Sequence, residues 1–537
     1  SSPKVYITFI HRLNCVPYTT ANRQNLNGKY HGVMCLVMSI DPRTPVLVGQ
    51  GQIVNRTNTL ADAREPAVLI AEAIRQATSD ANLSAIPEID ALHIVRLLSW
   101  KYTNPAHTVA SLLGIKARTY GITPHGGNMP QLLVNKLARE IQNGELEIAI
   151  LAGGEASNSR ARALKENVSL DWSQSIADTP SAQSIVDDAA MSSEQELARK
   201  IVLPVQIYPM FETALRASVN RNIDEHEKLI SELWSRFSNV AAKNEFAWSR
   251  TPLTAEQIRT VSAKNRMIGL PYRKVMNSNN QVDMAAALII CSAGKATQLG
   301  IPKEKWIFPH SGTDCHEHYY ISNRFSFADT PAVRLGGNMA CDLASTSLKE
   351  MSLIDLYSCF PSAVQLGAKS LNLSLDQQLT ITGGLSFSGG PWNNYVMHAI
   401  ATMMTQLRNT TDSSEKGFIW ANGGYATKHS FGVYSSAPSK NGFRHDSPQQ
   451  TIDALDKREL ASPPEAASDL VGKVKIEAFT VMHNRDGQPE TAIAATLLRD
   501  SRRAWATSSD PQVATALSSG EWIDREVSLD SAGTLRI

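Results

Sequence analysis

From Thr44 onward the chain alternates short apolar segments with amphipathic ones. "PVLVGQG" and "IDALHIVRLL" have the apolar runs typical of strands, while "REPAVLIAEAIRQATSDANL" and "TNPAHTVASLLGI" repeat apolar residues at helical spacing. "LEIAILAGGEA" begins with consecutive apolar residues, as expected of a strand that is covered on both faces of a parallel sheet. This alternation predicts a layered α/β domain.

The same pattern occurs a second time between residues 301 and 440. Each pass has a glycine-rich turn that opens an apolar helix, Gly126-Gly127-Asn128 in the first and Gly389-Gly390-Pro391 in the second. Each helix leads to a strand that ends in a glycine pair, Gly153-Gly154 or Gly423-Gly424. The repeated arrangement predicts a duplicated α/β unit.

Two further segments lie outside these passes. The stretch between them is polar with helical periodicity, which indicates an inserted helical domain that caps a site. After the Pro- and Ser-rich "ELASPPEAASD", the tail predicts two strands joined at Arg485-Asp486-Gly487. The predicted domains are an N-terminal extension (1–43), a first half (44–156 with 267–300), a helical loop domain (157–266), a second half (301–440) and a small β-rich domain (470–537).

Composition places the chain among ordinary globular proteins. It has 537 residues, of which 42% are hydrophobic and 19% charged, enough for a large core. The formal charge of +1 gives no global field toward nucleic acid, and no apolar run reaches the roughly 18 residues of a transmembrane helix. The six cysteines are dispersed without Cys-x-x-Cys pairs, which predicts reduced thiols and an intracellular protein.

The first 37 residues contain four basic residues and no acidic residue. Such a composition is typical of an organelle-targeting segment and would place the protein in the mitochondrial matrix. The alternative is that Met38, which opens "MSIDPRTPVLVG", is the natural start, and that the protein is cytoplasmic.

The first glycine-rich turn is a candidate binding site. A helix N-terminus presents unpaired N–H groups and a positive dipole end, so Gly126, Gly127 and Asn128 could bind an anion or an oxyanion. His125 beside them is a candidate acid or base, with a structural role as the alternative. The turn contains no Ser or Cys nucleophile.

A second candidate lies where "DLYSCFPSAVQ" passes from strand to helix, the position at which α/β folds hold reactive groups. Tyr357 and Cys359 alternate with Ser358, so the first two are expected to face one side and Ser358 the other. Cys359 is either a reactive thiol or a small buried apolar residue.

Two glycine-containing loops complete the candidate set. In "GGLSFSGGPWNN", Gly389 and Gly390 permit close approach of the backbone to a ligand, and Trp392 follows at the helix start. The loop "ANGGYATKHSFGVYS" combines a cation, a phenol and an imidazole after a strand, which is typical of a ligand site. Its candidates are Asn422, Tyr425, Lys428 and His429.

Two other polar segments give weaker signals. His316 and His318 stand beside Asp314, Cys315 and Glu317, but their spacing lacks a distant ligand pair, so no metal site is predicted. The polar residues 277–283 could cap a following helix or contribute to a site.

Together these motifs resemble the thiolase superfamily, most closely the thiolase-like proteins of type 1, which are catalogued with acetyl-CoA acetyltransferases and carry an additional C-terminal domain. The resemblance runs from about Pro45 to Asp530 and rests on ordered motifs that include "GGNMPQLLVNKLARE", "DLYSCFPSAVQ", "TGGLSFSGGPWNNYVMHAIATM" and "EAFTVMHNRDG". It implies a duplicated five-layer α/β fold with a helical loop domain and a small β-rich C-terminal domain. It also implies CoA or acyl-CoA as ligand, with no permanently bound cofactor.

In active thiolases a Cys at the start of the buried first-half helix forms an acyl-enzyme and is activated by a His in a Gly-His-Pro turn. By resemblance, the Cys position falls at about Gly126, within one residue, and the His position falls at Gly390. A third motif corresponds to residues 357–360, and a fourth to "NGGYATKHSFG" without its Cys. The resemblance therefore implies that Cys-dependent thiolysis is lost or altered.

Three functions follow as hypotheses. The first is a thiolase-like acyl-CoA-binding protein of lipid metabolism with a degenerate active site, an acyltransferase if it is active. The second is a non-catalytic subunit of a larger assembly. The third is an aldolase-type lyase of CoA esters that uses Tyr357, Tyr425 and His429 as acids and bases. Cys359 as a relocated nucleophile remains an option, and a homodimer is an alternative to the larger assembly.

Overall fold

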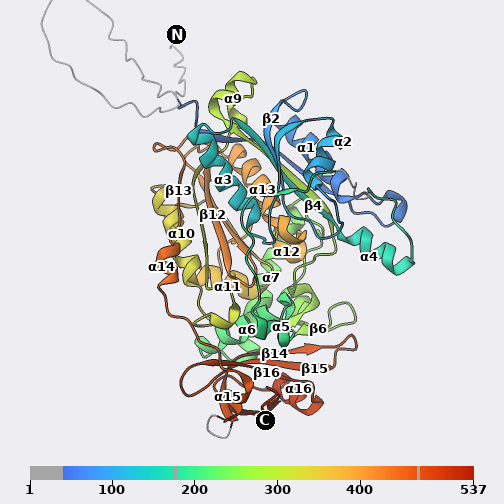
Figure 1. Ribbon diagram of the computed structural model, residues 1–537, viewed down its shortest axis with the longest axis vertical. Helices are drawn as coiled ribbons and strands as arrows, with labels where there is room; N and C mark the ends of the chain where they lie inside the picture. The colour runs from blue at the N-terminus through green and yellow to red at the C-terminus, as the bar shows by residue number, and fades with distance from the viewer. Residues whose placement is uncertain (1–39, 174–178, 469–471) are drawn as a thin grey trace, which may run out of the picture. The chain divides into compact units, whose positions relative to one another are not determined.

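The computed structural model describes residues 40–173, 179–468 and 472–537. The prediction of a targeting segment in residues 1–37 therefore lies outside the described residues. Residues 42–537 form one compact unit, to which the following description applies (Figure 1). Within the described ranges, no helix is both long and apolar enough to cross a membrane.

The first half is built on a six-stranded sheet with the order β1-β8-β4-β2-β3-β5. Strands β4, β2 and β3 are parallel, whereas β8 runs antiparallel to both β4 and β1. The expected parallel sheet is therefore a mixed one. Its strands are β1 (Pro45–Val54), β2 (Ile89–Ile94), β3 (Ala117–Ile122), β4 (Ile148–Ala156), β5 (Gln183–Ser184) and β8 (Asp283–Ser292), and its helices are α1 (Pro66–Asp80), α2 (Pro105–Leu113), α3 (Met129–Asn143) and α9 (Ala293–Gln298).

The second half repeats this plan with a five-stranded sheet of order β10-β11-β12-β9-β13. The predicted duplication is confirmed, because α13 and β11 in this half correspond to α3 and β4 in the first. Its strands are β9 (Phe308–His316), β10 (Leu353–Leu356), β11 (Lys416–Gly423), β12 (Lys428–Ser435) and β13 (Arg444–Asp446), and its helices are α10 (Pro331–Leu343), α11 (Pro361–Ser370), α12 (Gly384–Phe387), α13 (Tyr395–Asn409) and α14 (Gln449–Asp453).

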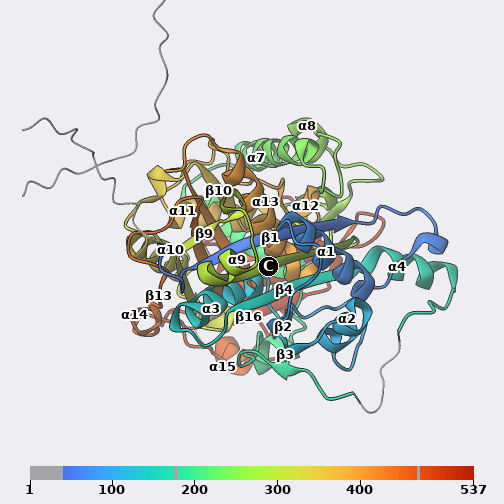
Figure 2. The same ribbon diagram turned by 90° about the horizontal axis from the view of Figure 1, so that it is seen from above.

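The two sheets and their helices form the expected five layers (Figures 1 and 2). Helices α3 and α13 contact strands of both sheets and make up the central layer, while α1 packs on the first sheet and α10 on the second. All residues of β4 and β8 are buried, because helices cover both faces of the first sheet. The N-terminal ends of α3 and α13 meet, since the Asn393 side chain just before α13 bonds Gly126 just before α3.

The segment between the halves is helical, as predicted. Helix α7 is amphipathic and buries Ile230, Trp234 and Phe237 against the core. Helix α6 is buried along most of its length despite an internal proline, Pro209. The segment comprises α4 (Ser157–Glu166), α5 (Glu194–Ala198), α6 (Pro204–Ser218), α7 (Ile223–Lys243) and α8 (Ala255–Arg259).

The C-terminal domain is a sheet of order β16-β15-β14-β17-β18 with its own hydrophobic cluster. The predicted hairpin is present, with Gly487 in the turn at φ 78°. Strand β6 pairs with β14, so residues 267–273 join this sheet rather than the first one. The elements are β6 (Met267–Gly269), β7 (Tyr272–Arg273), β14 (Lys473–His483), β15 (Pro489–Leu497), β16 (Arg503–Ser508), β17 (Glu526–Leu529), β18 (Leu535–Arg536), α15 (Pro463–Ser468) and α16 (Pro511–Ser518).

The expectation that residues 277–283 cap a helix is wrong, because the segment that follows is strand β8. Asp283 begins this strand, and its carboxylate accepts hydrogen bonds from the backbone N–H and the hydroxyl of Ser159 at 3.0 and 2.6 Å. The apolar run "MAAALII" is compatible with a buried helix or a buried strand, and its periodicity alone could not separate the two.

Candidate functional site

The turn before α3 is held in place by tight glycine packing. The Gly126 N–H donates to the Asn393 side-chain oxygen at 3.1 Å, and the Met129 N–H donates to the Gly126 carbonyl at 3.1 Å. A Cβ at Gly423, the end of β11, would lie 2.3 Å from the Asn128 side-chain oxygen and 3.0 Å from the Gly126 Cα. The turn therefore presses against β11 at a distance that only glycine permits.

Gly127 faces the hydroxyl of Tyr357. A Cβ at Gly127 would lie 2.2 Å from the Tyr357 Oη and 2.5 Å from the Asn422 carbonyl oxygen, whereas a Cβ at Gly126 would meet the side chains of Asn128 and Met129. Burial raises the pKa of the Tyr357 hydroxyl above its ordinary value, so it stays protonated at neutral pH. A hydrogen-bond donor therefore occupies the space into which a side chain at residue 127 would project.

The space beside Gly390 is filled in a similar way, by side chains of another segment. A Cβ there would lie 2.2 Å from the Ser278 Oγ and 3.0 Å from the Asn280 Oδ1, and these two side chains bond one another at 2.7 Å. The Gly390 N–H donates to the Asn279 carbonyl at 2.9 Å. The polar residues 278–280 thus pack against this turn, which explains their polarity better than helix capping does.

Cys359 lies in a buried polar cluster with Tyr208 of α6 and Asn422. The Tyr208 hydroxyl accepts from the Asn422 side-chain amide at 2.8 Å and from the Ala426 N–H at 3.0 Å, and its ring stacks on Phe360 with the centroids 4.7 Å apart. Burial raises the pKa of the Cys359 thiol to about 12, although a hydrogen bond from Tyr208 opposes the rise. A thiol with that pKa is a poor nucleophile at neutral pH.

His429 is a buried core histidine on β12. It pairs directly with Asn422 across the sheet, so the two side chains share one face. The Trp420 indole N–H donates to the His429 Nδ1 at 3.2 Å, and burial lowers the pKa of His429 to about 3. Tyr425 points elsewhere, because its hydroxyl donates to the Val202 carbonyl of the loop domain at 2.6 Å.

His125 and Lys428 lie close together beside the turn. The Lys428 Nζ lies 3.5 Å from the His125 carbonyl oxygen, and both side chains are near Asp188. Burial lowers the pKa of His125, and the positive charges of Arg96 and Lys428 lower it further while Asp188 opposes them. These effects favour the neutral form of His125.

His125 also lines a cavity of about 840 Å³, here named the Arg96 cavity. Arg96, Trp100, Lys101 and Arg160 line it as well, and none of its described lining residues is acidic. The Asn393 side-chain amide donates to the Arg96 carbonyl at 2.8 Å, which ties the cavity wall to the turn before α3.

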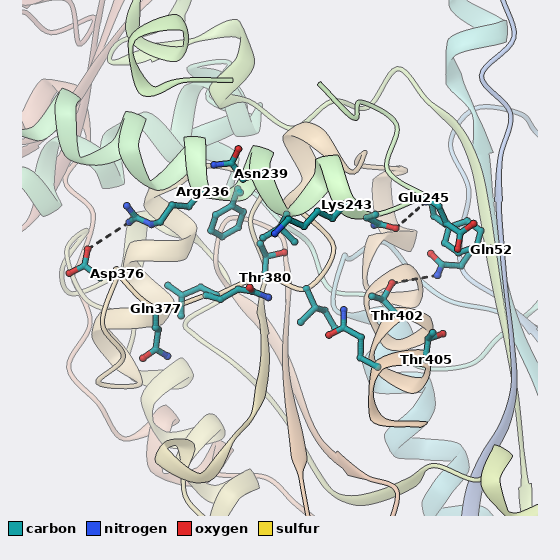
Figure 3. A pocket seen from close by; sticks show the side chains of 18 residues that line it. Gln52, Arg236, Asn239, Lys243, Glu245, Asp376, Gln377, Thr380, Thr402 and Thr405 are labelled. Atoms are coloured by element: carbon teal, nitrogen blue, oxygen red, sulfur yellow. Dashed lines mark hydrogen bonds and ion pairs between the residues drawn. The ribbon is translucent and has the colours of Figure 1, made fainter. Parts of the chain in front are cut away.

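A second cavity, of about 510 Å³, lies between α7 and α13 and is named the α7–α13 cavity (Figure 3). Figure 3 shows Arg236 of α7 directed toward Asp376, with 4.0 Å between the closest atoms, while Gln52 approaches Thr402 of α13 at the other end. Its charged lining residues balance, with Arg236 and Lys243 against Glu245 and Asp376.

The structure thus brings together Tyr357, Cys359, Asn422 and the turn of residues 126–128, and places the other candidates around this cluster. Trp392 is 39% exposed and donates from its indole to Ser157 Oγ at 3.2 Å, and Gly389 packs on Met284.

Tyr208 and Asn393 contact the site but were not among the sequence candidates. Asn393 follows the Gly389-Gly390 turn and could have been included on that ground, whereas Tyr208 lies in the inserted helical segment, to which the sequence assigned no site residue.

Comparisons with known proteins agree with this architecture. The family model described as the thiolase-like protein type 1 additional C-terminal domain matches residues 456–534. No curated protein matches the chain significantly in sequence. Among solved structures, a monomeric SCP2-thiolase-like protein type 1 from Mycobacterium smegmatis is 28% identical, with 93% of this chain and 100% of that chain covered and a TM-score of 0.77.

More distant structures share the fold. An Ltp2–ChsH2(DUF35) aldolase is 16% identical over 73% of this chain and 98% of its own, with a TM-score of 0.54. Human mitochondrial 3-ketoacyl-CoA thiolase is 15% identical over 74% of this chain and 99% of its own, with a TM-score of 0.52. Together with the matched C-terminal domain, these likenesses show that the chain has the fold and the domain composition of a thiolase-like protein of type 1.

Proposed function

We propose that this protein binds a CoA ester on a thiolase scaffold and does not carry out Cys-dependent thiolysis. The observation that carries the proposal is that the spaces beside Gly127 and Gly390 are filled, at or next to the positions that the resemblance assigns to the thiolase Cys and His. If the Cys position corresponds to Gly127, the space for the thiol is taken by the Tyr357 hydroxyl and the Asn422 carbonyl. If the activating His corresponds to Gly390, its space is taken by Ser278 and Asn280.

The geometry also argues against a relocated nucleophile. With a pKa of about 12, the Cys359 thiol is ionised to roughly one part in 10⁵ at pH 7. His429, whose pKa of about 3 keeps it neutral, accepts a hydrogen bond from Trp420 at Nδ1. Its Nε2 has no hydrogen-bond partner among the described residues, so it forms no thiolate–imidazolium pair with Cys359. The ligand class comes from the family resemblance and from the 3-ketoacyl-CoA thiolase that shares the fold.

A lyase acting on CoA esters is the second candidate, favoured by the place of Tyr357. Its protonated hydroxyl lies against the N-terminal turn of α3, where it can donate to a thioester carbonyl or to a developing enolate oxygen. A fold shared with an aldolase is compatible with this chemistry but does not demonstrate it.

Calorimetry with acetyl-CoA and acetoacetyl-CoA tests the binding proposal. Measurable affinity is expected, and its absence, together with co-purification of a fixed partner, would favour the non-catalytic subunit instead. In parallel, the protein is incubated with acetoacetyl-CoA and CoA, and cleavage is followed by loss of the enolate absorbance. No thiolysis is expected, and turnover at ordinary enzyme rates that is abolished in Cys359→Ala would refute the proposal.

The lyase candidate is tested with Tyr357→Phe, which removes only the hydroxyl. If the protein cleaves 3-hydroxyacyl-CoA esters, the variant should lose that activity while it keeps its affinity for the ester. Tyr425→Phe is the matched control, because the Tyr425 hydroxyl bonds Val202 and not the turn before α3. Equal activity of the Tyr357→Phe variant and the unaltered protein would exclude Tyr357 as the acid.

A further inference from the structure

All the charged side chains that line the Arg96 cavity are cationic. Three cationic side chains line it, those of Arg96, Lys101 and Arg160, and the described lining residues include no carboxylate. All three are solvent-exposed, and the guanidinium of Arg160 bonds the Leu98 carbonyl at 3.2 Å. Neither Arg96 nor Lys101 has an ion-pair partner in the described part of the chain, so their charges are free to meet an anion.

Carboxylates close to the cavity are already engaged. Glu65 accepts a hydrogen bond from the hydroxyl of the lining residue Tyr102 at 2.8 Å. Glu155, at the end of β4, accepts hydrogen bonds from the backbone N–H groups of Leu98 and Ser99 at 2.8 and 2.7 Å. Asp188, which is exposed, interacts electrostatically with His125 and Lys428. None of these carboxylates forms an ion pair with Arg96, Lys101 or Arg160 among the described residues, although Glu155 and Arg160 interact at longer range.

The wall that carries the cations is organised before any ligand binds. Glu155 bonds two of its N–H groups, Ser99 Oγ accepts from the Ala156 N–H at 2.9 Å, and the Arg96 carbonyl accepts from Asn393. Trp100 packs edge-on against Trp172, with the ring centroids 4.9 Å apart, and its indole donates to the Ser173 carbonyl at 2.9 Å. A fixed wall binds with less loss of conformational entropy than a mobile one.

We propose that the Arg96 cavity binds the phosphate groups of a nucleotide. Arginine forms bidentate hydrogen bonds with phosphate, lysine adds a point charge, and Trp100 offers an aromatic surface for a base. A volume of about 840 Å³ is in the range of cofactor sites. The nucleotide is either free or the 3′-phosphoadenosine diphosphate end of a CoA ester, and in the second case the inference deepens and rests on the proposed function.

The position of the cavity links it to the candidate site. His125 lines the cavity and is two residues from Gly127, and Asn393 bonds both the cavity wall and the turn before α3. A CoA ester held by its phosphates in the Arg96 cavity would therefore lie beside the turn that packs against Tyr357. The α7–α13 cavity is less suited to a polyanion, because its two cations are balanced by two carboxylates (Figure 3).

The test is isothermal titration calorimetry of the full chain with three probes: CoA, adenosine 3′,5′-bisphosphate and pantetheine. CoA and the bisphosphate are expected to bind, and pantetheine at least 100-fold more weakly, because it lacks the phosphates. Arg96→Ala and Arg160→Ala should each weaken CoA and bisphosphate by about tenfold or more. Affinity should also fall as salt rises, because these exposed charges are screened.

Arg236→Ala is the matched control, since it removes the same charge from the α7–α13 cavity. It should leave the affinity for both phosphate probes unchanged. Because Arg96 and Arg160 are exposed, their alanine variants are expected to fold, and circular dichroism and the melting temperature verify this.

The outcomes separate this inference from the proposed function. If CoA binds but Arg96→Ala and Arg160→Ala keep full affinity, or pantetheine binds as tightly as CoA, the cavity inference is overturned and CoA binding stands. If the bisphosphate binds in an Arg96-dependent manner while CoA and acetyl-CoA do not bind, the cavity takes a free nucleotide and the proposed function fails. If none of the probes binds, both are overturned.

Discussion

Replacing Gly127 by alanine tests the packing that defines the candidate site. The new Cβ would lie 2.2 Å from the Tyr357 Oη, 2.7 Å from its Cζ and 2.5 Å from the Asn422 carbonyl oxygen. Favourable contacts between non-bonded heavy atoms lie near 3.5–4.0 Å, so each of these contacts is about 1 Å too short. The Asn422 oxygen belongs to the backbone of β11 and cannot rotate away.

Overpacking of this kind lowers the free energy of unfolding by about 1–3 kcal/mol. Because the new Cβ clashes with both a side chain and the backbone, we expect a loss of about 3 kcal/mol. Unfolding entropy is about 2.1 cal/mol/K per residue, so for a unit of about 500 residues a loss of 3 kcal/mol lowers the melting temperature by about 3 °C. Differential scanning calorimetry of the variant and the unaltered protein measures this shift.

A double-mutant cycle tests whether the contact with Tyr357 accounts for this loss of stability. In a Tyr357→Ala background the phenol is gone and only the contact with the Asn422 oxygen remains, so Gly127→Ala should cost about half as much there. Gly520→Ala is the control, because the nearest backbone atom to its Cβ lies at 3.8 Å and the nearest side-chain atom, of Trp522, at 3.2 Å. A Gly127→Ala protein as stable as the unaltered one, or an equal cost in both backgrounds, would refute the reasoning.

Three further predictions follow from buried groups. Cys359 should react with iodoacetamide in the native protein about 10³-fold more slowly than an ordinary thiol, because its pKa is about 12; rapid labelling of Cys359, read by mass spectrometry, would contradict its burial. Burial raises the pKa of Glu155 from 4.5 to about 7, so between these values the native state holds a proton that the unfolded chain has lost, and stability falls by about 3 kcal/mol as the pH rises. Glu155→Gln should flatten this part of the stability profile measured by urea unfolding, and an unchanged slope would show that other groups produce it. Arg503→Met should cost about 3 kcal/mol, because it leaves the carboxylate of Glu477, whose side chain is 13% exposed, without its partner. Adding Glu477→Gln should restore part of this loss. Limited proteolysis of the C-terminal domain measures both effects, and equal resistance of all variants would count against the pair.

Residue periodicity predicted the layers because it is a local property. Segments such as β4 and α3 carry enough apolar residues at one spacing to identify the element without knowledge of its partner. The same reasoning failed at β8, where a short apolar run fits either a strand or a helix. It also missed the mixed sheet, since the direction of a strand depends on which strand it pairs with.

Candidate residues were found where they stand next to glycine-rich turns or strand ends, as Asn128, Tyr357 and Asn422 do. Tyr208 was missed because it lies in the inserted helical segment, far along the chain from the glycine-rich turns, and only folding brings its hydroxyl against Asn422. The resemblance left the thiolase Cys position open by one residue around Gly126. The surroundings of a side chain at Gly126 or at Gly127, which differ between the two positions, exist only in the folded turn.

By itself, the sequence determined the α/β alternation, the duplication, the helical insertion and the C-terminal hairpin, because each depends on residues close together in the chain. The tertiary structure alone decided which side chains share a space. Asn393 bonds Gly126 across 267 positions of sequence, Tyr357 covers Gly127, and Ser278 covers Gly390. Such contacts follow from how the layers pack, and hydrophobic periodicity carries no information about which residues meet when two layers close on one another.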